Sequence, residues 1–192
     1  MTDAPSVSID DPAGGLDALD ALLTAAKNAG AESADALLAV GESLSASVRL
    51  GAPERMERSE AVDLGLRVFV GRRSAIVSAT DLRAESFATL AERAVAMARI
   101  APEDEHAGIA EADQLAIDPP AIESGDFLGP EAEALVDRAR AVEDAARAVT
   151  GVSNSDGAEA SWSRSRVALA ASNGFRGGYA GGRHGVGVAV LA

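Results

Sequence analysis

The sequence contains no cysteine and only two histidines, and aromatic residues make up 3% of its 192 residues. Without cysteine the chain can form no disulfide bond and has no thiolate for catalysis or metal binding. Catalytic zinc sites use three protein ligands, and two histidines that stand far apart in the sequence, with no cysteine, would leave most of such a site to carboxylates. The composition therefore excludes thiol chemistry and offers little to hold a metal ion.

Basic residues are scarce as well, since 17 Lys and Arg stand against 30 Asp and Glu and give a formal net charge of −13. A negative surface repels the phosphate backbone, so we expect no direct binding of nucleic acid. The first residues lack the basic start and apolar run of a secretory signal, and no stretch has the length and hydropathy of a membrane span. We therefore expect a soluble, cytoplasmic protein with no membrane partner.

The N-terminal part of the sequence predicts a tail and then a helix. Residues 1–15 are rich in Asp, Pro and Gly and have little to bury, so we expect them to be disordered. Beyond them, Leu and Ala recur at helical spacing until Gly30, a residue type that commonly ends a helix. The residues of this stripe are Leu16, Leu19, Leu22, Leu23, Ala26 and Ala29.

Four antiparallel strands are expected next. Apolar and polar residues alternate over 43–50, Gly51-Ala52-Pro53 predicts a turn, and the charged run 55–61 is typical of an edge strand. Residues 64–81 predict a hairpin that turns at Gly71. These segments predict a four-stranded antiparallel sheet.

A second helix should follow the hairpin. Asp81 is a residue type that can cap the start of a helix, and Pro102 marks its expected end. The residues 16–101 are therefore predicted to form an N-terminal α+β domain with the order helix, four strands, helix. We expect the inward side chains of the second helix to be Phe87, Leu90, Ala94 and Met97.

The next segment, 102–129, is polar, acidic and proline-bearing, and we expect it to be a linker on the surface. Pro130 suits the first position of a third helix, and we expect this helix to end at Gly151. The apolar residues that should face one way on this helix are Leu135, Val142 and Val149.

Three strand-like runs complete the sequence, at 158–163, 166–171 and 175–191. In the last run, apolar and small residues alternate up to the final residue. We therefore expect 130–192 to be the start of a second, central α+β domain that is incomplete. An uncovered apolar strand should also make the chain self-associate. The apolar residues concerned are Val186, Val188 and Val190.

Several of these segments resemble the TldD/PmbA family, whose members are also called modulators of DNA gyrase and are classed among metallopeptidases. The resemblance runs from about Leu16 onward and covers only the N-terminal portion of a family member. The segments that carry it are 64–81, 153–158 and 168–179. Those that resemble the PmbA (TldE) branch in particular are 78–82, 107–110 and Arg183-His184.

The resemblance implies a subunit of a heteromeric metalloprotease. Such a subunit pairs with a TldD-like partner in the cytoplasm, and the two process unfolded or extended peptides. In that family picture the TldD-like partner holds the zinc, and this chain is non-catalytic. An extended peptide can gain main-chain hydrogen bonds at a sheet edge, so a subunit of this kind can contribute to peptide binding without a catalytic group.

The residues themselves support no catalytic, cofactor or metal site. The metallopeptidase members carry a His-Glu-x-x-x-His helix, and this sequence has none. His106 stands in an acidic stretch and fits an exposed loop, whereas Arg183 and His184 stand on an expected strand, where they are candidates to contact a partner or peptide.

Trp162 is interpreted as a packing residue, with a role as an interface anchor as the alternative. The glycines of 174–187 lack the spacing of a phosphate loop and fit bulges or close backbone approaches.

A non-catalytic binding or scaffold module is the alternative function. Its basic strands would hold an acidic protein partner, and an independent hydrolase is a weaker third reading because no ligand cluster is present. The sequence leaves open which peptide is processed and which oligomer the chain forms. The basic residues concerned are Arg164, Arg166, Arg176 and Arg183.

Overall fold

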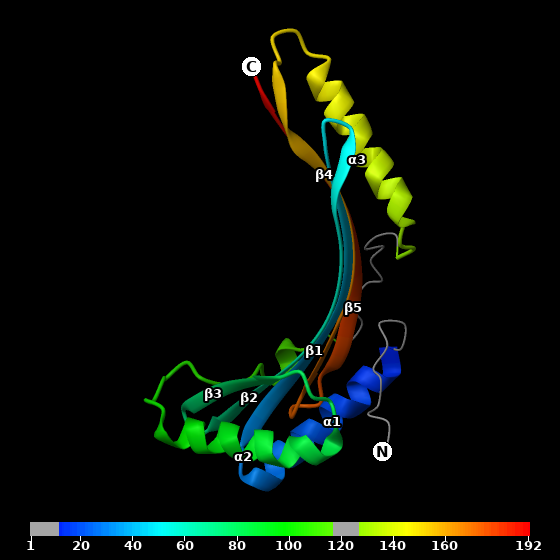
Figure 1. Cartoon of the computed structure of the whole chain (residues 1–192). Coiled ribbons are helices and arrows are strands. Elements are labelled where there is room, and N and C mark those ends of the chain that lie inside the picture. The colour runs from blue at the N-terminus through cyan, green and yellow to red at the C-terminus, as the bar shows by residue number, and fades with distance from the viewer. Residues whose placement is uncertain (1–11, 117–126) are drawn as a thin grey trace. The chain divides into compact units, whose positions relative to one another are not determined.

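Figure 1 shows a computed structural model of the chain, which describes residues 12–116 and 127–192. The described part has an α+β fold, as predicted, and its strands form one sheet in the order β3-β2-β1-β4-β5. The predicted tail and linker fall partly on residues 1–11 and 117–126, which lie outside the described residues. The elements are α1 (Pro12–Ala29), β1 (Ser33–Arg49), β2 (Ala52–Val70), β3 (Arg73–Ala79), α2 (Ala84–Ile100), η1 (Ala112–Gln114), α3 (Ala132–Arg147), β4 (Asn154–Ala171) and β5 (Arg176–Leu191).

The chain divides into two compact units, each built from separate stretches of sequence. β1, β2, β4 and β5 contribute residues to both units. The domain bounds expected from the sequence are consecutive instead, and they stay a prediction. The first unit comprises residues 1–40, 62–122 and 166–179, and the second comprises residues 41–61, 123–165 and 180–192.

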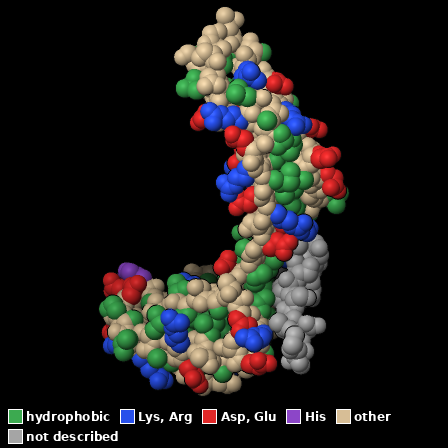
Figure 2. Space-filling model, viewed as in Figure 1, with side chains coloured by type: hydrophobic (Ala, Val, Ile, Leu, Met, Phe, Trp, Pro, Cys, Tyr) green, Lys and Arg blue, Asp and Glu red, His purple; other side chains and the backbone are tan. Residues whose placement is uncertain are grey.

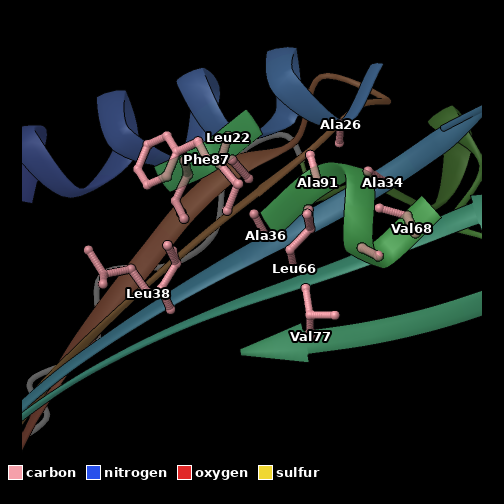
Figure 3. Close-up of a cluster of buried hydrophobic side chains, with 14 of the residues drawn as sticks. Leu22, Ala26, Ala34, Ala36, Leu38, Leu66, Val68, Val77, Phe87 and Ala91 are labelled. Carbon is pink, nitrogen blue, oxygen red and sulfur yellow. The ribbon is translucent and has the colours of Figure 1, made fainter. Parts of the chain in front are cut away.

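The first unit buries its core between two helices and one face of the sheet (Figure 3). α1 and α2 supply the helical side, and alternate residues of β1 and β2 supply the other, as in a half-buried sheet. Burying a Leu or Phe side chain contributes about 1.5–3 kcal/mol, so the few large residues outweigh the many alanines. The labelled core residues are Leu22, Ala26, Ala34, Ala36, Leu38, Leu66, Val68, Val77, Phe87 and Ala91.

The end of α1 confirms the sequence pattern. The leucines and alanines of the predicted stripe are buried or half-buried in the core. Gly30 has a φ of +102° and donates its N–H to the Lys27 carbonyl at 3.0 Å, while Ala31 donates to the Ala26 carbonyl at 3.0 Å. These two bonds form a Schellman motif, which satisfies carbonyls of the last turn and favours glycine at the positive φ.

Two helix starts differ from the prediction. α1 begins at Pro12 and not near Leu16, because the fixed φ of proline suits a first helical position. α3 begins at Ala132, with Pro130 before the cap, because the backbone of Glu131 is extended with a ψ of 149°. Both sequence patterns therefore marked a helix correctly and missed its first residue.

Asp81 does not cap α2, contrary to the prediction. The capping position belongs to Arg83, and the helix begins at Ala84. The carboxylate of Asp81 accepts the backbone N–H of Arg83 at 3.0 Å and its guanidinium at 2.7 Å. The bond from the Arg83 side chain lowers the pKa of Asp81 to about 2, and the Arg83 amide adds to this. Asp81 therefore holds the turn that precedes the helix.

The inner face of α2 is partly as predicted. Phe87 and Ala94 are buried and Leu90 packs against the core, but Met97 is exposed. Alanines take much of this face, and their small side chains let α2 pack closely on α1 and β3. The buried residues that the sequence pattern did not mark are Ala91, Val95 and Ala98.

The strands are longer and fewer than predicted. The run 55–61 and the first strand of the hairpin form one strand, β2, and the runs 158–163 and 166–171 form β4. Polar residues interrupt the apolar pattern inside each strand, whereas the backbone ladder continues through them. β3 pairs with β2 only from Leu64↔Ala79 to Val70↔Arg73, so the charged half of β2 is an edge, as predicted.

The second unit packs α3 against the sheet. Val149 was expected on the inner face, but the helix ends at Arg147 and Val149 is exposed. Glu143 takes the inner position instead. The apolar residues of this smaller core are Ala46, Val48, Leu135, Val136, Ala139, Ala158 and Ala160. Within the described residues, no helix has the length and hydropathy needed to cross a membrane.

Replacement of Gly71 tests the hairpin. Gly71 has a φ of +58° and a Cβ there would meet no atom within 4 Å, so only the backbone conformation opposes a side chain. Because positive φ costs an L-residue about 1–2 kcal/mol, we expect Gly71→Val to lower the free energy of unfolding by at least about 1 kcal/mol in urea melts. Gly71→Asn, which tolerates this conformation, should lose clearly less. Equal losses would show that the turn does not require positive φ.

Candidate functional site

A buried carboxylate is the most constrained polar group of the second unit. Glu143, on α3, has a side chain that is fully buried. Its Oε1 accepts the N–H of Leu50 at 2.8 Å, and its Oε2 accepts the N–H of Gly51 at 2.8 Å. Ser155, on β4, donates its hydroxyl to Oε1 at 2.5 Å. One carboxylate thus joins the helix, the β1–β2 turn and β4.

The turn that Glu143 holds is strained. Leu50 has a φ of +52° and Gly51 a φ of +80°, and two positive φ values in a two-residue hairpin loop are typical of a type I′ turn. The sequence had predicted the turn one residue later, at Gly51-Ala52-Pro53. Leucine gains nothing from this conformation, which costs about 1–2 kcal/mol. The two hydrogen bonds to Glu143 offset this cost, and Arg140 Nε donates to the Gly51 carbonyl at 3.1 Å.

Ser155 reaches Glu143 because β4 is irregular at this point. Ser155 and Ala158 are both buried, so the alternation of the strand slips by one residue between them. Gly157, in the slip, has a φ of +113°, and a Cβ there would lie 3.0 Å from the Val48 carbonyl. The Gly157 N–H donates to the Ser155 hydroxyl at 3.0 Å. The slip therefore requires glycine and fixes the hydroxyl that Glu143 accepts.

These donors keep Glu143 ionised. The Ser155 hydroxyl does most to lower the pKa of Glu143, the amides of Gly51 and Leu50 and the charge of Arg147 lower it further, and burial acts in the opposite direction. A general base needs a free lone pair facing its substrate. The hydrogen bonds that Glu143 accepts join it to the turn and to β4, so this arrangement positions the turn.

A second carboxylate joins three strands on the sheet surface. Glu42, on β1, accepts Arg58 of β2 at 2.7 Å and Arg164 of β4 at 2.9 Å. Glu42 is mostly shielded from solvent, whereas Arg58 is exposed. The guanidinium of Arg164 also lies 5.8 Å from the ring of Trp162. This network fixes Arg164, one of the four arginines of the predicted basic surface.

His184 has a partner that the sequence did not indicate. Its Nδ1 lies 3.1 Å from Nη1 of Arg138, on α3. Arginine only donates, so Nδ1 accepts this bond and the ring proton sits on Nε2, where it can be donated to a ligand. Arg183 and His184 are neighbours on β5 and therefore point to opposite faces of the sheet. The structure thus joins His184 to Arg138 and separates it from Arg183.

The other residues singled out from the sequence serve local roles. His106 is exposed beside Glu105, at 3.4 Å, as its loop position indicated. Trp162 is buried against the backbone of Gly129, which agrees with a packing role, and its Nε1 has no hydrogen-bond partner in the described structure. A Cβ on Gly178 would lie 2.5 Å from the Val167 carbonyl, which confirms the expected close approach of two backbones.

Two of the four arginines of the predicted basic surface, Arg164 and Arg176, are paired with acidic residues. Arg176 contacts Asp20 at 2.9 Å and Asp17 at 3.5 Å in the first unit, and Arg164 is bound by Glu42. Figure 2 shows blue and red side chains interspersed over the viewed surface of each unit. These ion pairs leave less free positive charge than the sequence of the C-terminal strands indicated.

The described residues do not fit a zinc ion. His184 uses Nδ1 to accept from Arg138, and His106 has one neighbouring carboxylate. No group of three or more His, Cys, Asp or Glu in residues 12–116 and 127–192 could hold a metal. The buried carboxylate, Glu143, already accepts three hydrogen bonds.

In each of two hollows in the described part of the first unit, an acidic side chain is already paired with an arginine. One, of about 410 Å³, lies at the end of α1, and its Asp20 is bound to Arg176. The other, of about 290 Å³, has Asp35 and Arg67 among its lining residues, and the two side chains are joined at 2.5 Å. Its apolar lining comes from Ile109, Leu115, Leu169 and Phe175.

Two family models match consecutive parts of the chain. Residues 34–98 match the PmbA/TldA metallopeptidase domain 1, and residues 125–192 match the PmbA/TldA metallopeptidase central domain. The chain is 30% identical over 179 residues to the Metalloprotease PmbA of Escherichia coli O157:H7. This match covers 90% of the chain and 39% of that relative, so the chain spans about two fifths of its length.

Solved structures share the fold. A candidate modulator of DNA gyrase from Bacteroides thetaiotaomicron VPI-5482 has a TM-score of 0.75 at 17% identity, over 88% of this chain and 39% of its own. TldE from Thermococcus kodakarensis has a TM-score of 0.68 at 15% identity, over 90% of this chain and 39% of its own. At these identities the likeness concerns the fold alone.

Removal of the Glu143 carboxylate should destabilise the protein strongly. Glu143→Ala leaves the amides of Leu50 and Gly51 and the Ser155 hydroxyl without their acceptor, and we expect the free energy of unfolding to fall by about 3 kcal/mol. Glu133 lies exposed on the same helix, so Glu133→Ala should change stability by less than about 0.5 kcal/mol. Urea unfolding of both variants is the measurement. A loss for Glu143→Ala no larger than for its control would contradict a structural role.

The lowered pKa of Glu143 also makes stability depend on pH. Its pKa in the folded protein lies below the ordinary value of 4.5, so the contribution of the carboxylate is complete above that pH and is lost as the pH falls through the folded-state pKa. We expect the stability difference between the natural protein and Glu143→Gln to shrink between about pH 5 and pH 3. A difference that stays constant over this range would show that Glu143 is not ionised in the folded protein.

Proposed function

Because the chain belongs to the PmbA/TldD metallopeptidase family, we propose that it is part of a TldE-like subunit of a heteromeric metalloprotease. In this proposal the protein works in the cytoplasm, and a TldD-like partner holds the zinc. The two subunits would process unfolded or extended peptides. This chain would be non-catalytic and would bind peptide or partner through its surface.

One observation carries this proposal. The two shielded carboxylates of the second unit already accept hydrogen bonds or ion pairs from other groups of the protein. Glu143 accepts two amides and a hydroxyl, and Glu42 is held between two arginines. Carboxylates of a hydrolytic site must instead face a metal, a water or a substrate. These facts support a role in binding and shape within a metallopeptidase family.

The pair His184–Arg138 is the proposed contact for peptide or partner. Both side chains are exposed, and the Nε2–H of His184 is free to donate because Nδ1 accepts from Arg138. Peptide carbonyls and carboxylates accept such bonds. Arg183, on the other face of β5, would be a separate contact.

A peptidase assay tests the proposal. The full-length protein is mixed with a TldD-like subunit and an unfolded model peptide, and cleavage is measured with each subunit alone and with both. We expect cleavage to require both subunits, and elemental analysis to find zinc in the TldD-like subunit only. Cleavage that never depends on this protein would favour the scaffold alternative. About one zinc held per chain of this protein would contradict its non-catalytic role.

A matched pair of variants tests the contact itself. Loss of one or two hydrogen bonds costs about 1 kcal/mol, so His184→Ala should raise the KM for peptide about 3–10-fold and leave kcat unchanged. Lys27→Ala, in the first unit, is the control and should leave both constants unchanged. A normal KM for His184→Ala would remove His184 from the proposed surface.

A further inference from the structure

The hollow of about 290 Å³ in the first unit lies on the face of the sheet that α1 and α2 do not cover. Ala34 and Ala36 of β1 point into the core beneath these helices (Figure 3), so Asp35, which stands between them, points to the other face. Arg67 stands between two core residues of β2 in the same way. Asp35 and Arg67 line the hollow together with residues 108–110, which follow α2 in the chain. All of its lining residues belong to the first unit.

The polar side chains of this hollow are already engaged. Asp35 Oδ2 accepts Nε of Arg67 at 2.9 Å and Nη2 at 2.5 Å, so the two charges cancel. The side-chain amide of Asn173 donates to the Ala110 carbonyl at 2.8 Å and accepts the backbone N–H of Phe175 at 3.1 Å. The other side chains of the lining are apolar. A neutral, apolar group therefore suits the hollow better than an ion, which would lose its hydration without gaining a partner charge.

The main chain beside the hollow carries unpaired hydrogen-bonding groups. Among the described residues, the amides of Gly108, Ile109 and Ala110 find no acceptor, and the carbonyls of Gly108 and Ile109 find no donor. Ile109 is half-buried and lines the hollow, whereas its two neighbours are exposed. A Cβ on Gly108 would meet no atom within 4 Å, so the space beside this backbone is open. Free main-chain donors and acceptors of this kind are what an extended peptide pairs with when it binds alongside a protein segment.

We propose that this hollow takes one apolar side chain, of about the size of leucine, from an extended peptide whose main chain pairs with residues 108–110. The inference rests on the proposed function for its ligand, an unfolded peptide, and it assigns that peptide a site in the first unit, whereas His184 belongs to the second. A volume of about 290 Å³ is below the about 300–1,000 Å³ of pockets that bury a drug-sized ligand, so the hollow suits a single side chain. A free apolar molecule would use the lining alone and leave the main-chain groups unpaired. A peptide supplies both parts.

Binding of labelled peptides to the full-length protein, without a TldD-like subunit, tests the proposal. Each peptide is a Gly/Ser chain with one guest residue, and its fluorescence anisotropy is followed up to about 1 mM protein. We expect guest leucine to bind about tenfold more tightly than guest alanine, because more apolar surface leaves water. Guest lysine should bind no better than guest alanine. N-methylation of the guest leucine and its two neighbours removes the peptide's main-chain donors and should weaken binding about threefold or more.

Variants of the lining test the site itself. Ala171, on β4, lines the hollow and is half-buried, so Ala171→Leu places apolar atoms where the guest should lie. It should reduce the preference for guest leucine to less than about threefold without lowering the free energy of unfolding in urea. Ala88→Leu, on the exposed face of α2, is the matched control and should keep the preference. Leu169→Ala enlarges the hollow and should move the preference from leucine to phenylalanine, a change that destabilisation alone does not produce.

Three results would each overturn the proposal. One is equal binding of guest leucine and guest alanine, and another is a preference that neither Ala171→Leu nor Leu169→Ala changes. The third is undiminished binding of the N-methylated peptide, because the hollow would then take an apolar group without main-chain pairing. The cleavage assay stays independent of these outcomes: cleavage that still requires both subunits would keep the proposed function although this site is wrong. Leucine-selective binding to a protein on which cleavage never depends would keep the site and reject the proposed function.

Discussion

The second unit depends on one buried carboxylate. Glu143 lies at the inner face of α3, where an apolar residue would be expected, and it accepts two turn amides and one hydroxyl. The amides belong to Leu50 and Gly51, whose positive φ values the local sequence does not favour. α3 thus contributes more than apolar cover, because it supplies the acceptor that fixes the hairpin joining β1 to β2.

The features that the sequence predicted are those with local causes. The stripe on α1, the glycine at its end and the turn at Gly71 follow from spacing and from residue types with special backbone freedom. The α+β class follows from the change between helical and alternating patterns. Helix starts were missed by a few residues, because a proline or an acidic residue can occupy several positions near a helix N-terminus.

The features that the sequence did not predict depend on contacts between distant residues. Nothing near Leu50 indicates a left-handed conformation, because its acceptor lies 93 residues away on α3. Glu143 looks like an ordinary surface residue of a charged helix. Arg138 could not be linked to His184 without the register between α3 and β5. The slip in β4 at Gly157 left a signal, a glycine in a strand, but glycine alone does not show which hydroxyl it positions.

The central claim is that Glu143 holds the Leu50–Gly51 turn in a strained conformation. Hydrogen exchange of these two amides, resolved by NMR, tests it most directly, because a two-residue loop normally exposes its amides to solvent. The account predicts that both amides exchange orders of magnitude more slowly than in an unstructured peptide, as slowly as the paired amides of β1. Exchange of both amides at the rate of an unstructured peptide would contradict it.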